Sequence, residues 1–477
     1  MATSETPPAR SPRVEVDPRA DHLWWGLSAV GFALACWGFH DLRHDDAFIT
    51  FRYGQNLAEG VGPVFNPGQR ILGTTSGGHL LLSAAGHAIV GHEALPTLMN
   101  VLGVGGWVLS ASAIRRLLHD AVGPHLAILV GLAVLVGAGG SANWVALETD
   151  LAFAAALWAM CQSRAERHVW AAVLAGAAVV LRPDYGLLPL LLAIPMLRLG
   201  WPRALRCGGA YMLTAAPWYT FAWLYYGSPV PQSAGTKFQR VELATYLAHE
   251  LRHIARSVVP VVESDVQAGA IWLLIVLASV QLVRTAPRLW ILPAFGLLHL
   301  AGYLFLRPFV EHTWHLHPAA VLACAVTLGG VAAMALDTTR GRRGAVFAFM
   351  AIASAFYGVK TLTLADAHAA GYWSGARHRA YVEAAERIAR EGDEGDVIVA
   401  LEVGTLAYYA GREMHDLGGL VTTAALPIPP PPHVRWTVVT PAEYDLVAPL
   451  RPREIHRASP GAFVAVVSRV GWNEPRR

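Results

Sequence analysis

Apolar residues come in separated runs along most of the chain, and polar residues fill the short stretches between the runs. Each run is about 14 to 22 residues long, close to the roughly 20 residues that a helix needs to cross a bilayer. A transmembrane barrel would instead alternate apolar and polar residues. The pattern therefore predicts a mainly α fold, a polytopic transmembrane helical bundle. The candidate spans lie near residues 23–40, 74–91, 96–118, 124–140, 148–162, 169–181, 185–198, 206–226, 267–285, 289–306, 316–337 and 344–363.

The connections between the runs alternate in charge. Arginines gather in every second connection, which by the positive-inside rule lies in the cytoplasm. The other connections and the tail then lie outside, so a chain that starts in the cytoplasm needs an odd number of spans, about eleven. The run at 74–91 is short and rich in glycine, and we predict that it is re-entrant or interfacial. The basic connections are Arg115-Arg116, Arg164 to Arg167, Arg198 to Arg206, Arg284 to Arg288 and Arg340 to Arg343.

The composition changes at both ends of the chain. Residues 1–21 are rich in proline and charge, which predicts a disordered cytoplasmic N-terminus. Residues 22–364 form the predicted membrane domain, with an outer loop at 41–73, and residues 365–477 form a small extracytoplasmic α/β domain. In this last part we expect an amphipathic helix at Tyr381–Arg390, buried strands at Asp396–Leu401 and Phe463–Val467, and a loop at Pro427–Pro432.

Composition and charge narrow the class of protein. Hydrophobic residues make up 54% of the chain and charged residues 15%, a balance that a soluble chain does not normally carry. The net charge of +3 is too small to indicate a nucleic-acid partner. No glycine-rich phosphate loop or dinucleotide fingerprint occurs, so nucleotide-driven transport has no support. The four cysteines lie in or beside apolar runs without metal-ligand spacing, and we expect buried free thiols.

The densest group of polar residues follows the first apolar run and begins with Asp45 and Asp46. Two adjacent carboxylates at a membrane boundary repel each other and are costly to desolvate, so a site that places them beside a sugar hydroxyl or a metal is a natural use. One of them could act as a general base. The alternative is an acidic pair that caps a helix beginning at Ala47, since aspartate is a good N-cap.

The same stretch carries a resemblance to a known family. It holds four motifs, at Asp45 to Tyr53, Asn56 to Gly60, Val64 to Gly68 and Gly73 to Ser76. Together they resemble the first outer loop of the mycobacterial terminal arabinofuranosyltransferase type and its wider bacterial relatives, which are GT-C class membrane glycosyltransferases that use polyprenyl-phosphate sugars. The chain has Leu147 where relatives usually have methionine and Asp184 where they more often have glutamate, and the shorter arm of Asp184 alters its reach. The other matching segments are Ala146 to Thr149, Leu181 to Gly186, Tyr225 to Pro231 with Lys237, Val403 to Tyr409, and Asp416 to Val421.

The resemblance implies a GT-C-like fold and an inverting glycosyltransferase at a bacterial inner membrane, with the active site and the C-terminal domain outside. Asp45 or Asp46 would be the catalytic base, the donor a polyprenyl-phosphate sugar, and the acceptor a cell-envelope glycan or glycolipid among membrane lipids. The sugar stays open, with a pentose such as arabinofuranose as one candidate. No cofactor is required, although a divalent cation such as Mg²⁺ or Mn²⁺ is compatible with the sequence.

Three cations on the predicted outer face are candidates for the donor phosphate. Arg182 precedes Pro183, which bars a regular helix there and leaves the guanidinium at a span end, where it can pair a phosphate or act as an interfacial anchor. Lys237 lies in a long outer loop, where a lysine can also be simply solvated. Arg307 ends an apolar run and can face the phosphate of the donor or of a lipid.

Other outer residues are candidates for substrate binding. Glu148 begins an apolar run, where a carboxylate also favours a helix N-terminus. Near Arg307 lies a group of histidines and acids that matches no metal-binding spacing, so no metal site is expected. The substrate-binding candidates are Arg52, Tyr53, Glu148, Asp184 and His315, and the residues near Arg307 are Glu311, His312, Trp314, His315 and His317.

Two other functions compete with the transferase. A transporter or flippase of lipid-linked sugar would also place cations near a lipid phosphate, but such proteins often show two similar halves, and no internal symmetry is visible. A non-catalytic role would use the C-terminal domain to bind envelope glycan, with Tyr408, Tyr409 and Trp436 stacking on sugars. Core packing explains those aromatic residues equally well.

Overall fold

The computed structural model describes most of the chain. Several sequence predictions lie outside the described residues: the N-terminus up to residue 17, Glu311 and His312, the basic connection 340–343, and the boundary at 364. The side chain of Lys237 lies outside them as well. The described residues are 18–40, 43–136, 146–198, 200–237, 241–308, 313–336, 344, 347–359, 375–422, 426–427, 430–458 and 464–470.

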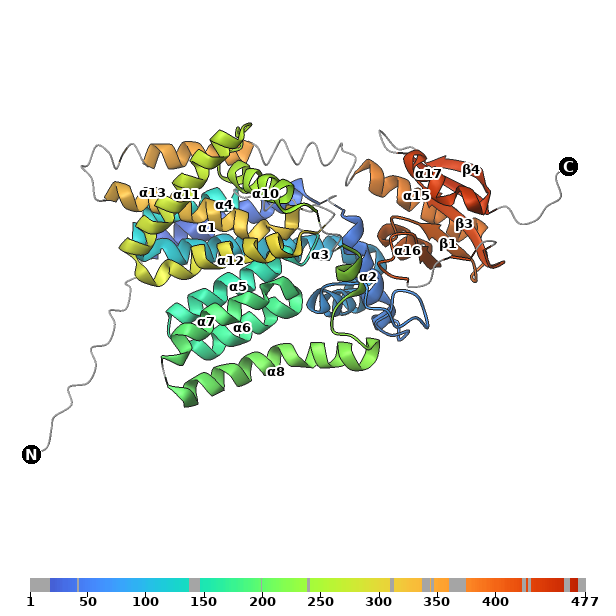
Figure 1. Cartoon of the computed structure of the whole chain (residues 1–477), viewed down its shortest axis with the longest axis horizontal. Helices are drawn as coiled ribbons and strands as arrows, with labels where there is room; N and C mark the ends of the chain where they lie inside the picture. Colours follow the sequence, from blue (N-terminus) through green and yellow to red (C-terminus); the bar gives the residue numbers. More distant parts are fainter. Residues whose placement is uncertain are drawn as a thin grey trace, which may run out of the picture.

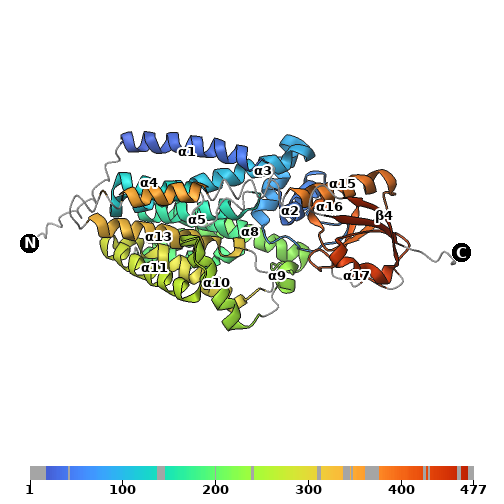
Figure 2. The same cartoon turned by 90° about the horizontal axis from the view of Figure 1, so that it is seen from above.

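The first and larger part is an elongated helical bundle whose helices run roughly along one axis (Figure 1). Figure 2, turned by 90°, shows the same roughly parallel course of the helices, with α1 along one edge. Its elements are α1 (Pro18–Gly38), α2 (Asp45–Ala58), α3 (Gly77–Val122), α4 (Pro124–Leu135), α5 (Thr149–Arg164), α6 (His168–Leu181), η2 (Pro183–Leu187), α7 (Leu188–Leu197), α8 (Trp201–Tyr226), α9 (Gln232–Lys237), α10 (Leu243–Val258), α11 (Asp265–Thr285), η3 (Pro287–Trp290), α12 (Ile291–Leu306), η4 (Thr313–His315) and α13 (His317–Leu336), and a further apolar helix spans Phe347–Val359.

The helices have the composition of membrane spans. Within the described residues, four helices are long and apolar enough to cross a membrane: Gly77–Val122, Asp265–Thr285, Pro287–Leu306 and His317–Leu336. Shorter apolar helices of 10–17 residues lie beside them. The predicted fold class, a helical membrane bundle with a small C-terminal domain, is confirmed. The count of about eleven crossings stays a prediction.

A kink at Gly91 divides α3 into two helices. Gly91 has φ 78° and ψ −179°, a backbone region that only glycine adopts readily. From Gly77 to Val90 the rise of about 1.5 Å per residue gives about 21 Å, less than the roughly 30 Å of a bilayer core. The re-entrant or interfacial placement of 74–91 stays a prediction. The second part of α3 packs along α5 and α4 in the bundle, and Gly106 lets α3 approach the backbone of Asp150.

The C-terminal domain is built on a five-stranded sheet of order β2-β1-β3-β5-β4. β1 pairs in parallel with β2 and β3, whereas β5 is antiparallel to β3 and β4. The predicted amphipathic helix is found as α15, and the predicted strands overlap β1 and β5. The elements are α15 (Ala376–Glu391), β1 (Val397–Ala400), α16 (Gly404–Ala410), β2 (Glu413–Asp416), β3 (Val434–Val439), η5 (Pro441–Glu443), α17 (Tyr444–Val447), η6 (Ala448–Leu450), β4 (Pro452–Ala458) and β5 (Ala465–Val470).

The domain sits at one end of the bundle, with α2 and the outer loop between them (Figures 1 and 2). The Asn66 amide both donates to the Met414 carbonyl oxygen at 2.9 Å and accepts from the Met414 N–H at 3.0 Å, and it thereby pairs with the edge of strand β2. Gln232 of α9 donates to the carbonyl oxygens of Gly419 and Thr422 at 2.7 and 2.9 Å. Contacts from the outer loop and from α9 therefore hold the C-terminal domain in place.

Candidate active site

Helix α2 begins at Asp45, two residues before the Ala47 start that the capping alternative supposed, and its N-cap His44 makes no side-chain cap. Asp45 instead caps a helix of the other domain. Its two carboxylate oxygens accept hydrogen bonds from the backbone N–H groups of Gly404 and Thr405, at 2.9 and 2.8 Å, at the start of α16. A Cβ at Gly404 would lie 2.0 Å from the Asp45 carbonyl oxygen, which explains a glycine there.

Asp46 lies next to Asp45 but projects about 100° away around the helix. It is partly buried, and its charge acts on both Glu148 of the bundle and Glu402 of the C-terminal domain. Asp46 therefore lies at the seam between the two parts of the molecule. Because Thr50 follows it by four residues, the two side chains share one face of α2.

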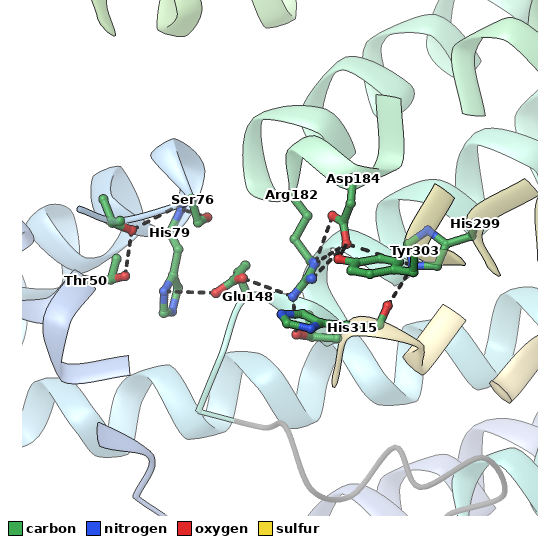
Figure 3. Close-up of polar contacts among 11 residues, drawn as sticks. Thr50, Ser76, His79, Glu148, Arg182, Asp184, His299, Tyr303 and His315 are labelled. Carbon is green, nitrogen blue, oxygen red and sulfur yellow. Dashed lines mark hydrogen bonds and ion pairs between the residues drawn. The ribbon is translucent and has the colours of Figure 1, made fainter. Parts of the chain in front are cut away.

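A chain of polar contacts leads from Thr50 into the bundle (Figure 3). The hydroxyls of Thr50 and Thr74 lie 2.8 Å apart, and the Ser76 N–H donates to the Thr74 hydroxyl at 3.3 Å. The Ser76 hydroxyl in turn accepts from the His79 N–H at 3.0 Å, and the His79 Nδ1 lies 3.7 Å from Glu148. The Gly-Thr-Thr-Ser motif therefore connects α2 to the start of α5.

Arg182 lies at the end of this chain, between two carboxylates. It is the C-cap of α6, where Pro183 ends the helix as the sequence predicted. Its Nη1 donates to Glu148 at 3.3 Å and to the Thr149 hydroxyl at 3.0 Å, and its Nη2 donates to Asp184 at 2.8 Å. Arg182 and Glu148 are each only 7% exposed. We call Arg182 and its partners Glu148, Thr149 and Asp184 the Arg182 cradle.

Residues of α12 and η4 close the far side of the cradle (Figure 3). The Tyr303 hydroxyl donates to Asp184 at 2.7 Å. His299 Nε2 lies 2.8 Å from the His315 carbonyl oxygen, and the rings of Tyr303 and His315 are stacked with centroids 5.2 Å apart. The structure thus brings together Arg182, Glu148, Asp184 and His315, which the sequence placed in three separate connections.

The cradle contains one guanidinium and two carboxylates, so with its carboxylates ionised it carries a formal charge of −1. An anionic phosphate that approaches Arg182 would have to compete with Asp184 and Glu148 for the same N–H groups. Sugar hydroxyls, which both donate and accept hydrogen bonds, suit this mixed set of donors and acceptors better.

Arg307 offers a different kind of cationic position. It ends α12 in the left-handed conformation, with φ 46° and ψ 63°, which a non-glycine residue adopts only at a cost. Its Nη1 donates to the Val241 carbonyl oxygen at 3.1 Å, a few residues after Lys237. Among the described residues Arg307 has no carboxylate partner, so its charge is available to an anion.

Arg52 and Tyr53 lie away from the cradle. The Tyr53 hydroxyl donates to the Ile71 carbonyl oxygen at 2.6 Å and accepts from the Gly73 N–H at 2.8 Å, which fixes the Gly-Thr-Thr-Ser segment. Arg52 donates to Gln55 at 3.2 Å, and burial lowers its pKa while the Glu59 carboxylate partly restores it. Both side chains position α2 and its neighbours, and their predicted contact with substrate stays a prediction.

Two residues of this seam were not among the sequence candidates. Glu402 forms an ion pair with Arg377 of α15, beside Asp45 and Asp46. Burial, reinforced by the Asp45 carboxylate, raises the pKa of Glu402 to about 8 even though Arg377 opposes the shift. Their signal in the sequence was faint: Glu402 directly precedes the recognised Val403 to Tyr409 segment.

The aromatic residues proposed for glycan stacking belong mainly to the core. Tyr408 and Trp436 are each 1% exposed. The Tyr408 ring stacks on His92 at 4.1 Å, and Trp436 donates to Asp396 at 2.7 Å. Within the described residues no group of three or more His, Cys, Asp or Glu side chains could hold a metal ion. All four cysteines are free, and three of them are buried.

The fold is that of the GT-C class of membrane glycosyltransferases, and the resemblance read from the sequence motifs is confirmed. Over 239 residues the chain is 29% identical to the terminal β-(1→2)-arabinofuranosyltransferase of Mycobacterium tuberculosis, a match that covers 45% of this chain and 38% of that protein. The chain thus matches well under half the length of this curated relative. No family model matches the chain.

Two solved structures share the fold at low sequence identity. ArnT from Cupriavidus metallidurans, bound to undecaprenyl phosphate, aligns with a TM-score of 0.62 and 13% identity over 97% of this chain and 100% of that one. The oligosaccharyltransferase AglB from Archaeoglobus fulgidus, in complex with an inhibitory peptide and a dolichol-phosphate, aligns with a TM-score of 0.51 and 12% identity over 89% of this chain and 70% of that one.

Proposed function

We propose that the protein is an inverting glycosyltransferase that moves a sugar from a polyprenyl-phosphate donor to a glycan or glycolipid of the cell envelope. The observation that supports the proposal is that the charge of Asp46, from the first-loop motif, acts both on Glu148 of the Arg182 cradle and on Glu402 of the C-terminal domain. The solved structures of the same fold, which hold undecaprenyl phosphate or a dolichol-phosphate, support a lipid phosphate as part of the donor.

In this proposal Asp46 is the general base. Both carboxylate oxygens of Asp45 already accept backbone hydrogen bonds from the start of α16, so this side chain has a structural task. Asp46 deprotonates the acceptor hydroxyl, whose oxygen attacks the anomeric carbon as the bond from that carbon to the phosphate oxygen breaks on the opposite face. The product keeps the new glycosidic bond, and the leaving polyprenyl phosphate keeps the electron pair.

The leaving phosphate needs a cation because its negative charge grows during the reaction. We assign this role first to Arg307, which has no carboxylate partner among the described residues, with Lys237 in the neighbouring segment. The Arg182 cradle, with its balance of donors and acceptors, then holds sugar hydroxyls. A pentose such as arabinofuranose is the candidate sugar, because the curated relative is a terminal β-(1→2)-arabinofuranosyltransferase. A related oligosaccharyltransferase structure contains Zn and sulfate, so metal dependence is tested by adding a chelator.

The test uses purified protein in detergent with a panel of polyprenyl-phosphate sugars and envelope acceptors. We expect release of polyprenyl phosphate together with a glycosylated product. Asp46→Asn should lower turnover by about 10²–10⁴-fold, the usual contribution of a general base, without weakening donor binding.

Asp45→Asn is the matched control, because it keeps the volume and one acceptor oxygen and should retain much of the turnover. Normal transfer by Asp46→Asn would remove the base assignment. Movement of lipid-linked sugar across vesicles without phosphate release would favour the flippase alternative.

A further inference from the structure

A second ionisable pair lies inside the bundle and is not used in the mechanism above. His317 begins α13, and Asp150 lies in the first turn of α5. The His317 Nε2 is 3.3 Å from Asp150 Oδ1, and the two side chains are 0% and 1% exposed. The Phe153 ring packs edge-on against the imidazole at 5.2 Å. Apart from this contact, the two carboxylate oxygens and the two ring nitrogens have no hydrogen-bond partner among the described residues, and the contact itself has the distance of an ion pair.

Burying an ionisable pair costs free energy, so its presence inside the bundle points to a role. An ionisable residue within a membrane bundle is a candidate for function unless its partner accounts for it. A histidine and an aspartate that share one proton carry no net charge whichever holds it, so the pair can exist in the core, whereas either residue alone would leave a charged or unsatisfied group.

Two groups of residues flank Arg182, and we call them the two banks of the Arg182 cradle. Each residue of the buried pair lies directly beside one bank. Asp150 follows Glu148 and Thr149, the partners of Arg182 on one bank. His317 follows His315, whose carbonyl oxygen holds His299 and whose ring stacks on Tyr303, the partner of Asp184 on the other bank. The banks are thus connected through Arg182 and again through the buried pair.

The backbone around Asp150 has little freedom to adjust. A Cβ at Gly106 of α3 would lie 2.8 Å from the Asp150 carbonyl carbon, so α3 and α5 are in close contact at this level. A change in the distance between α5 and α13 would therefore move the first turn of α5, and with it Glu148 and Thr149, rather than be absorbed by Asp150 alone.

We propose that Asp150 and His317 are positioning residues that set the separation of the two banks of the Arg182 cradle. The pair does not touch substrate, and its effect on transfer is exerted through Arg182. The catalytic consequence rests on the proposed function, whereas the coupling between the pair and the cradle does not.

The test is a double-mutant cycle of His317→Gln and Arg182→Gln in the full chain, followed by two readouts. The first is the midpoint of thermal unfolding in detergent without substrate, and the second is kcat/KM for release of polyprenyl phosphate. We expect His317→Gln alone to lower kcat/KM about 10-fold and to have little further effect once Arg182 is replaced, because interacting residues are not additive. The shift in unfolding midpoint should be non-additive as well.

Two further variants separate positioning from folding. Asp150→Asn keeps a hydrogen-bonding partner for His317 and should retain more activity than His317→Gln. Thr327→Val is the control in the same helix, since the Thr327 hydroxyl bonds only to Ala323 of its own helix among the described residues, at 2.6 Å, and it should leave turnover unchanged.

The two readouts distinguish the possible failures. Additive unfolding shifts, or equal losses of kcat/KM with and without Arg182, would overturn the positioning role. Suppose that the unfolding shifts of the variants are non-additive but the wild-type protein transfers no sugar. This result would uphold the coupling between the buried pair and the Arg182 cradle and contradict the proposed function.

Discussion

At the scale of single residues, neighbouring positions perform different tasks. Asp45 and Asp46 are adjacent in the chain, yet one holds the C-terminal domain and the other faces the seam with Glu148 and Glu402. The sequence identified the pair as the candidate site but could not choose between the two. The choice depends on the backbone N–H groups of Gly404 and Thr405, which lie about 360 positions further along.

Arg307 is a residue whose charge and backbone can be tested separately. Asparagine tolerates the left-handed conformation better than arginine, so Arg307→Asn should keep the protein folded while it removes the cation. A charge-assisted hydrogen bond is worth about 1.5–3 kcal/mol, which corresponds to about 10- to 100-fold in donor affinity. Initial rates at varied donor concentration give the KM. Arg307→Lys should recover part of the affinity, and an unchanged KM in Arg307→Asn would contradict the phosphate role.

Glu402 predicts how stability depends on pH. A carboxyl whose pKa is raised by folding binds more protons in the folded than in the unfolded state, so stability decreases as pH rises. For Glu402 the decrease should extend from its ordinary 4.5 to about 8 and then level off. Glu402→Gln should flatten this part of the stability profile, and above pH 8 the variant should be more stable than the wild type. Unfolding midpoints measured across pH test this.

The control for this profile is Glu454→Gln on β4, where the carboxylate pairs with Arg457 at an exposed position. Its profile should follow the wild type. A Glu402→Gln profile with the same slope as the wild type would mean that Glu402 is already ionised at neutral pH.

At the scale of elements, helix α2 shows how much the sequence could reveal. Helical spacing alone places Asp46, Thr50 and Tyr53 on one face and Asp45 and Phe48 on another. The partners of these faces were not predictable, because they belong to distant segments: Thr50 meets Thr74, and Phe48 meets Tyr408 at 5.4 Å between ring centroids. Periodicity describes one helix, whereas tertiary contacts depend on the packing of many.

The kink in α3 gives a prediction for an element. Gly91 adopts a conformation that costs other residues roughly 1–3 kcal/mol, and no atom crowds its missing side chain. Gly91→Ala should therefore destabilise the protein through the backbone alone and lower the unfolding midpoint. Gly105→Ala is the matched control, because Gly105 has an ordinary backbone and equally open surroundings in the same helix. Equal midpoints for both variants would show that the kink carries no strain.

At the scale of the whole molecule, the sequence predicted the architecture better than the site. Long apolar runs appear as helices, and the change of composition near residue 365 marks a separate domain. Strands β2, β3 and β4 were not predicted; β2 and β4 are rich in polar side chains, which makes them resemble loops in the sequence. The Arg182 cradle contains the candidates Arg182, Glu148 and Asp184, whose roles stay predictions. Tyr303 and His299 were not candidates, because they lie in an apolar run that looked like an ordinary span.

The orientation in the membrane is a prediction for the whole chain. Single cysteines at Arg203, in a basic connection, and at Arg435, in the C-terminal domain, both replace exposed residues. A membrane-impermeant maleimide added to intact cells should label Arg435→Cys and not Arg203→Cys, and the unaltered chain controls for the native thiols. Labelling of Arg203→Cys alone would reverse the predicted sides.

The pairing of Asn66 with Met414 has a consequence for the life of the protein before it is fully assembled. Strand β2 lies at the border of its sheet, and an open border offers a template to which another chain can attach. During synthesis the outer loop with Asn66 emerges hundreds of residues before this strand, so Asn66 is already present to pair with β2 when β2 is made. A domain produced without the rest of the chain would present a bare border, and we expect it to self-associate.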